Sequence, residues 1–216
     1  MTAPGNTAQA SPYRWPVARA ALAACGSPGQ RAIAACLLLA VLALPGVRHT
    51  LEASMWRHMV LQFPLWMLAG ALLASALPQR ARTALAPWNA HGISGLVATA
   101  TVLAVLMVPR VLDLALVSPG VEAAKCAALV LAGAALYLSW RPAGLVVQGF
   151  FLGNVLPMMA VVGQLYIDTP LRLCNAYLLD DQARLGQWLV GMAAVWAVGW
   201  LARVGWVMVQ REGSVA

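Results

Sequence analysis

Six long apolar stretches, separated by short polar breaks, dominate the chain. Pro, Gly or a charged side chain bounds each stretch, and their ranges are 32–47, 55–77, 92–109, 121–139, 144–166 and 186–208. A helix of about 20 such residues spans a bilayer core of about 30 Å. The stretches lack the in-out alternation of barrel strands, and lipid offers no partner to unpaired backbone groups. The pattern therefore predicts an all-α, polytopic bundle of about six transmembrane helices.

The composition supports a membrane environment. Hydrophobic residues make up 62% of the chain and charged residues only 10%, whereas a soluble domain has roughly half and a quarter. Too little polar surface exists to cover a globule in water, so we expect membrane lipid as the surroundings. The formal charge of +7 does not indicate nucleic acid, because the arginines stand singly between apolar stretches.

The arginines indicate the orientation. If the N-terminus is cytoplasmic, the cytoplasmic side carries a single acid, Glu212. Its basic residues are Arg14, Arg19, Arg31, Arg80, Arg82, Arg141, Arg203 and Arg211. The other side is balanced and holds Arg48, Arg57, Arg110, Lys125, Arg172 and Arg184 with Glu52, Asp113, Glu122, Asp168, Asp180 and Asp181. The positive-inside rule places both ends in the cytoplasm. In a bacterial inner membrane, most carboxylates would then face the periplasm.

The same pattern predicts three parts. Residues 1–31 form a flexible cytoplasmic segment, 32–209 the transmembrane helical domain, and 210–216 a cytoplasmic tail. The first apolar stretch ends in Leu-Pro-Gly, so cleavage as a signal segment stays open as an alternative to a first span. Gly149 and Gly153 form a GxxxG pattern, which predicts close contact of the fifth span with another helix.

A stripe on the second span suggests metal chemistry. Met55, His58, Met59 and Gln62 recur at i, i+3, i+4 and i+7, so they share one helical face. Thioether and imidazole groups suit a soft ion, and the metal-ligand candidates for Cu(I) are His58, Met59 and Met55. The alternative is an ordinary apolar face with one solvated or hydrogen-bonded histidine.

Two further groups are polar candidates. Glu122 and Lys125 lie three residues apart near the start of the fourth span, where they form either an ion or proton site or an interfacial pair that extends toward water. Asp180, Asp181 and Gln182 precede the last span. Acids in that position are typical helix caps that meet the positive end of the helix dipole.

Enzyme signatures are missing from the sequence. It contains no Walker loop, GxGxxG or HExxH pattern, and we predict a protein that is not an enzyme. A membrane enzyme would need acid-base groups such as His58 and Asp181 on one face. A small transporter or channel is the alternative, with Glu122, Lys125 and Asn154 lining a polar path between helices.

Four segments, taken in order, resemble one known family. Residues 54–73, SMWRHMVLQFPLWMLAGALL, contain a His-Met pair at His58 and Met59 that is followed by an apolar run. Residues 107–116, MVPRVLDLAL, are similar to an HxPxLYDxAL loop and match it at Pro109, Leu112, Asp113, Ala115 and Leu116.

The remaining segments are YLSWRP at 137–142 and LLDDQARLG at 178–186, in which Asp181 and Gln182 form the matching pair. Together the segments resemble the CtaG-like family of membrane proteins, which assist assembly of copper-containing cytochrome c oxidase.

The resemblance implies a membrane factor for respiratory oxidase biogenesis that helps copper reach the oxidase at the periplasmic face. Oxidase subunits or a periplasmic copper chaperone are the implied partners, and Cu(I) is the implied ion. Gln62 and Val108 stand where the family carries histidines, and Glu122 and Lys125 lie in another region where it carries them. The chain thus resembles the family's scaffold but carries fewer of its histidines.

Overall fold

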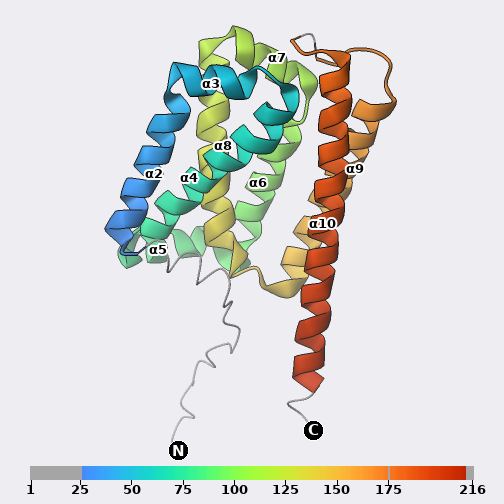
Figure 1. Ribbon diagram of the computed structural model, residues 1–216. Coiled ribbons are helices and arrows are strands. Elements are labelled where there is room, and N and C mark those ends of the chain that lie inside the picture. The colour runs from blue at the N-terminus through green and yellow to red at the C-terminus, as the bar shows by residue number, and fades with distance from the viewer. Residues whose placement is uncertain (1–25, 175, 213–216) are drawn as a thin grey trace, which may run out of the picture.

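The computed structural model describes residues 26–174 and 176–212, and the described chain is helical with no strand (Figure 1). Its elements are α2 (Pro28–Ala43), α3 (Pro45–Glu52), η1 (Arg57–Gln62), α4 (Phe63–Ala76), α5 (Gln79–Leu85), η2 (Ala86–Gly92), α6 (Ile93–Leu106), α7 (Pro109–Val117), α8 (Pro119–Trp140), α9 (Gly144–Asp168) and α10 (Leu179–Glu212). Five helical segments are long and apolar enough to cross a membrane, and α2 with α3 forms a bent sixth. The prediction of an all-α, multi-pass membrane bundle is confirmed.

The first predicted span is shorter at its end than expected. Leu44 is extended, because the residue before a proline is sterically excluded from the helical region, and α3 turns away from α2 by 70°. Ser27 and Gln30 cap α2 reciprocally, so this helix begins at Pro28, before the predicted boundary at 31. Residues 1–25 of the predicted cytoplasmic segment lie outside the described residues.

The last helix is longer than predicted. It begins at Leu179, so Asp180 and Asp181 lie inside its first turn, and it continues to Glu212. The predicted start at 186 was wrong because Asp and Arg side chains near a helix end break an apolar pattern without breaking the helix. Part of the predicted tail 210–216 is therefore helical.

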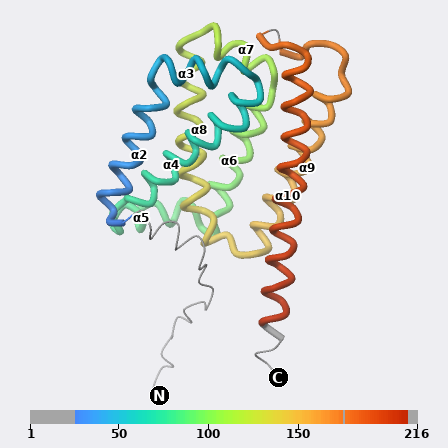
Figure 2. Tube along the Cα trace, viewed as in Figure 1, coloured from blue at the N-terminus to red at the C-terminus, as the bar shows by residue number. Residues whose placement is uncertain are grey.

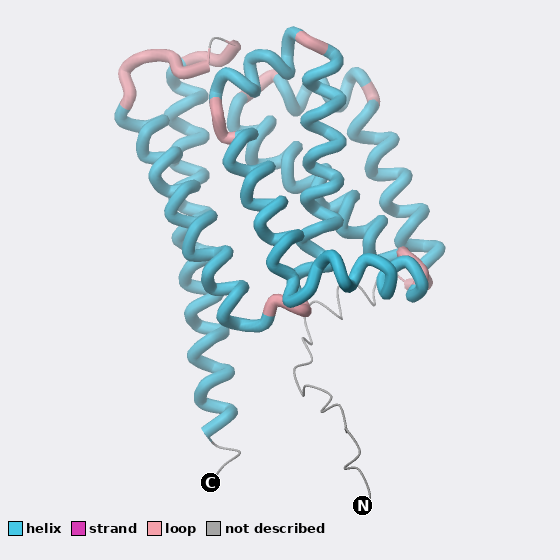
Figure 3. Tube along the Cα trace, turned by 180° about the vertical axis from the view of Figure 1, so that it is seen from behind, coloured by secondary structure: helices cyan, strands magenta, loops and turns pink. Residues whose placement is uncertain are grey.

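The helices form a main bundle and a hairpin. Figure 2 and Figure 3 show α9 and α10 side by side along their length, next to the group formed by α2, α4, α6 and α8. We call the end of the molecule that carries α3 and α7 the α3 end, and the opposite end, with α5 and η2, the α5 end (Figure 1). The first residue of α2 and the last residue of α10 both lie at the α5 end.

Two glycines allow α4 and α8 to pack backbone to backbone. A Cβ atom on Gly70 would collide with the carbonyl of Val130, and one on Gly133 with the carbonyl of Met67. Close approach through small residues is how helices associate where lipid removes the hydrophobic driving force. This contact holds α8 against α4, which continues directly from η1.

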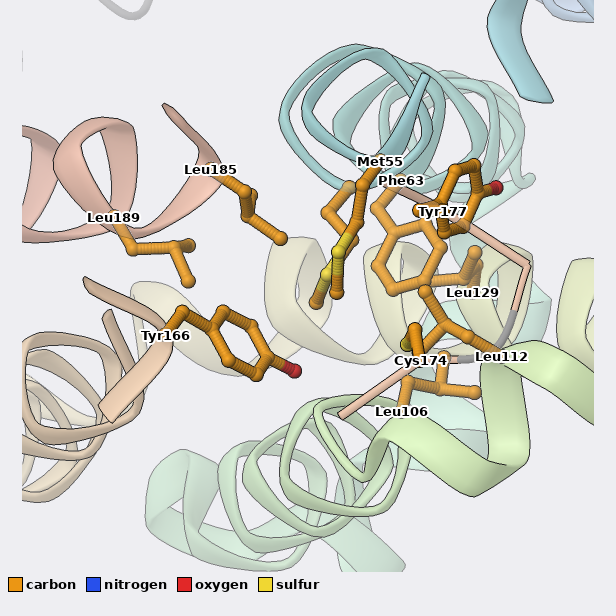
Figure 4. Packing of buried hydrophobic residues seen from close by; sticks show 11 residues of the cluster. Met55, Phe63, Leu106, Leu112, Leu129, Tyr166, Cys174, Tyr177, Leu185 and Leu189 are labelled. Carbon is orange, nitrogen blue, oxygen red and sulfur yellow. The ribbon is translucent and has the colours of Figure 1, made fainter. Parts of the chain in front are cut away.

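The main apolar core lies toward the α3 end. Figure 4 shows side chains from the main bundle and the hairpin meeting there, among them Met55, Leu129 and Tyr166. Leu185 and Leu189 bring α10 into the same cluster. The core therefore anchors the hairpin at the end of the molecule where the candidate site also lies.

Candidate functional site

The second span starts with a π-helix, which turns its polar side chains inward. Within η1, His58 and Gln62 are fully buried and Met59 is nearly so. A π-helical turn is rare and is found mostly at functional sites, because its wider spacing must be compensated by tertiary contacts. Just before η1, Asp181 of α10 accepts hydrogen bonds from Ser54 Oγ at 2.7 Å and the Met55 amide at 2.6 Å.

His58 lies between two polar partners. Lys125 Nζ is 2.7 Å from His58 Nε2, and Tyr177 Oη is 2.7 Å from His58 Nδ1. Because an ammonium can only donate, Nε2 acts as the acceptor and the ring proton is assigned to Nδ1, which donates to Tyr177. The imidazole is therefore neutral and fully hydrogen-bonded.

Glu122 and Lys125 form a buried ion pair. Lys125 Nζ lies 2.7 Å from Glu122 Oε2, without the alignment of a hydrogen bond, and both residues are 3% exposed. The Lys125 ammonium also lies 5.9 Å from the centre of the Phe63 ring. The alternative of an interfacial pair that extends toward water was wrong, because His58 of η1 contacts Lys125 and Arg48 of α3 lies against Glu122.

A second ion pair closes the group from α3. Arg48 Nε is 2.9 Å from Glu52 Oε1 and 3.7 Å from Glu122 Oε1. Two cations thus balance two carboxylates, which lowers the cost of keeping charges away from water. We call this group the polar cluster, and it consists of Arg48, Glu52, His58, Gln62, Glu122, Lys125 and Tyr177.

One side-chain atom of Gln62 has no hydrogen-bond partner among the described residues. Its Nε2 donates to Glu52 Oε1 at 3.4 Å, whereas its buried Oε1 has no hydrogen-bond partner among the described residues. A buried amide oxygen without a partner costs about 1–3 kcal/mol.

The loop between α9 and α10 gathers the other predicted residues. Asp113 Oδ1 accepts from the Ala176 amide at 3.3 Å, and Gln182 Oε1 accepts from the Leu173 amide at 2.9 Å. Gln182 also donates to the carbonyl of Tyr166 at 3.3 Å. The same loop supplies Tyr177 to His58. Asp113 and Gln182 thus position the loop that completes the polar cluster.

Asp181 does not act as a cap of its own helix. Its two oxygens accept from Ser54 and Met55 instead, so the capping part of the prediction was wrong for Asp181. Asp180 and Asp181 do lie in the first turn of α10, where they meet the positive end of the helix dipole as predicted. Sequence cannot reveal the contact of Asp181 with Ser54 and Met55, because the donors lie more than 100 residues away in the chain. The contact ties α10 to the start of η1.

The Tyr177 phenol has a pKa above its usual value. Burial away from water is the larger cause, and the nearby carboxylate of Glu52 adds to it. The phenol therefore stays neutral at physiological pH. It keeps its oxygen available to His58 and its own proton available to a further acceptor.

The residues predicted to bind copper lie together, but His58 is already occupied. Met55 and Met59 are buried in the apolar core, and both ring nitrogens of His58 are engaged by Lys125 and Tyr177. Within the described part of the chain, no three His, Cys, Asp or Glu side chains are grouped as a metal site. These residues do not fit a resident Cu(I) ion while the Lys125 ammonium lies against His58. Binding at His58, Met59 and Met55 stays a prediction.

A polar hollow opens beside Tyr177 on the surface of the α3 end. It encloses about 520 Å³ and is lined by Arg57, Asp180 and Arg184 together with Tyr177 and its neighbours. Trp56 and Trp188 stack nearby with ring centres 6.1 Å apart. Tyr177, which contacts His58, is thus part of the lining of a surface hollow.

Sequence reasoning missed part of the cluster and misplaced one residue. Arg48 and Glu52 show an i,i+4 pairing after Pro45 that could have been noticed, whereas nothing in the pattern points to Tyr177. Asn154 lies apart from the cluster, in an apolar hollow between α6 and α9, where its amide donates to the Phe150 carbonyl at 2.7 Å.

The fold and the site define a class: a multi-pass helical membrane protein with a charge-balanced polar cluster buried at one end. Compared with known proteins, the chain matches no family model, no curated protein and no solved structure.

Proposed function

We propose that the chain is a membrane-embedded assembly or accessory factor for a copper-containing respiratory oxidase, acting at its α3 end. One observation carries this proposal. The segments that resemble the CtaG-like family are far apart in the sequence, yet His58, Asp113 and Gln182 all contact the connection between α9 and α10. Asp181, which follows this connection, binds Ser54 and Met55 of another of these segments. Residues with unrelated roles in packing have no reason to converge on one short loop.

We further propose that the α3 end faces the periplasm of a bacterial inner membrane. The α5 end carries Arg31, Arg80, Arg82 and Arg141, and the described carboxylates other than Glu212 lie toward the α3 end. Positive residues are retained on the cytoplasmic side during insertion, which supports this orientation.

The hollow beside Tyr177 is the proposed docking place for the partner. Arg57, Asp180 and Arg184 offer both signs of charge at its rim, which suits a polar segment of an oxidase subunit or of a periplasmic copper chaperone. Copper is the cargo in this proposal. Because Lys125 holds His58 Nε2, the ion is carried by the partner, while the polar cluster keeps the docking loop in position.

Complementation of a deletion strain under copper-limited growth tests the proposal. We expect the wild-type gene to restore the haem spectrum and copper content of the membrane-bound oxidase. Asp181→Asn removes the charge that holds η1 and should restore much less, at equal membrane abundance of the variant. Asp168→Asn is the matched control, because among the described residues Asp168 is hydrogen-bonded to Gln164 alone, on the surface of α9. A deletion strain with unchanged oxidase and copper would refute the proposal.

A further inference from the structure

A second hollow lies at the α5 end, on the opposite side of the molecule from the polar cluster. It encloses about 560 Å³ between α5, η2, the start of α6 and the end of α8. Its polar and aromatic lining includes Arg82, Trp88, Asn89, His91, Tyr137 and Arg141. None of these residues takes part in the proposed function.

The floor of this hollow is held by a specific set of contacts. Asn89 donates to Ser139 Oγ at 2.9 Å and accepts from the Gly95 amide at 3.1 Å. Gly92 has a positive φ of 69° and lies against the Ser139 carbonyl, where a Cβ atom would collide. The chain turn that presents His91 is therefore fixed against α8.

The lining is positively charged without a compensating acid. Arg82 and Arg141 both line the hollow, and no carboxylate does. Arg82 is held in place by carbonyls at the end of α4 and lies 6.0 Å from the Tyr137 ring centre. Arg141 and His91 are exposed and can turn toward a ligand. Two guanidinium groups and an imidazole in one hollow match a phosphate group.

The position of the hollow relative to the membrane indicates the source of that phosphate. Trp88 is 83% exposed at the rim, and Leu85 and Leu138 continue the lining as an apolar surface. Exposed tryptophan is typical of the headgroup level of a bilayer, and an apolar surface next to it suits acyl chains. Basic hollows between helices at this level favour anionic headgroups over free anions.

We propose that this hollow binds an anionic glycerophospholipid, with its phosphate between Arg141, His91 and Arg82 and its acyl chains along Leu85 and Leu138. The lipid joins α5, η2 and the end of α8, and so stabilises the α5 end. This site does not depend on the function proposed for the polar cluster.

Thermal unfolding of the delipidated protein in mild detergent tests the site. We titrate phosphatidylglycerol and, separately, phosphatidylcholine and inorganic phosphate. Phosphatidylglycerol should raise Tm with a saturating dependence that the other two additives do not reproduce. Arg141→Gln should weaken the apparent affinity about fivefold, the effect of one basic contact near the membrane surface, and His91→Gln should also weaken it.

Arg80→Gln is the matched control, because Arg80 is exposed on α5 and does not line the hollow. Its affinity should equal that of the wild type. Equal responses to the two lipids, or equal losses in the Arg80 and Arg141 variants, would overturn the proposal. A full response to inorganic phosphate would replace the lipid by a free anion and would overturn it too.

Discussion

At the scale of single residues, Lys125 has the most unusual environment. It is the only lysine in the chain, it is 3% exposed, and its ammonium contacts Glu122, His58 and the ring face of Phe63. An isolated buried charge in such a place would cost several kcal/mol, so each of these contacts is needed to keep it there.

Replacement of Lys125 by Met should therefore destabilise the protein by about 3–5 kcal/mol, because it leaves the buried Glu122 carboxylate with only the more distant Arg48 guanidinium, at 3.7 Å, to balance its charge. The double variant with Glu122→Gln and Lys125→Met should recover most of this loss. Unfolding in mixed micelles of sodium dodecyl sulfate and dodecyl maltoside measures both. The control is Arg110→Met on the exposed surface of α7. Additive losses in the double variant would show that the two charges are not coupled.

Residue spacing alone indicated some of these contacts. The i,i+3 relation of Glu122 and Lys125 predicts that the two side chains meet, and the structure has them at 2.7 Å. The depth of the pair was not predictable, since it depends on α4 packing over α8. Tyr177 was not predictable either, because it reaches His58 from a loop whose path is set by Asp113 and Gln182.

At the scale of elements, helix ends were harder to predict than helices. Apolar length identifies each span, but a helix begins and ends where capping and steric conflicts act. Pro45 ends α2 through Leu44, whereas Asp180 and Asp181 do not delay the start of α10. Asp181 of α10 binds Ser54 and Met55 just before the π-helical η1, a contact between distant segments that no local pattern predicts.

The GxxxG pattern predicts close helix contact correctly at one of its two glycines, because Gly149 packs against the Trp200 ring of α10. A Cβ atom on Gly153 of the GxxxG pair would touch nothing, whereas Gly133 lies against the backbone of Met67. Gly133→Ala should therefore cost about 1–3 kcal/mol by forcing α4 and α8 apart. The matched variant Gly153→Ala should be neutral or slightly stabilising, because alanine favours the helix. The same detergent unfolding assay compares them, and equal effects would contradict the packing described above.

At the scale of the whole molecule, the charge distribution predicts the orientation. Arginines without nearby carboxylates gather at the α5 end, and the mixed charges lie at the α3 end.

Single cysteines in a cysteine-free background test this orientation. Asp180→Cys at the α3 end should react with a membrane-impermeant maleimide in intact spheroplasts, and Gln79→Cys at the α5 end only after lysis. Both positions are exposed, so access and not burial decides the result. The reverse pattern would invert the proposed topology.

The sequence by itself determined the solvent of this protein, the number of its apolar helices and the sorting of its charges between two ends. These properties depend on composition and on local apolar length, which act along a single segment. Only the tertiary structure decided that Lys125 is buried against His58, that Asp181 supports η1, and that a loop closes the polar cluster. Those contacts join segments far apart in the chain, and their geometry exists only after the helices have packed.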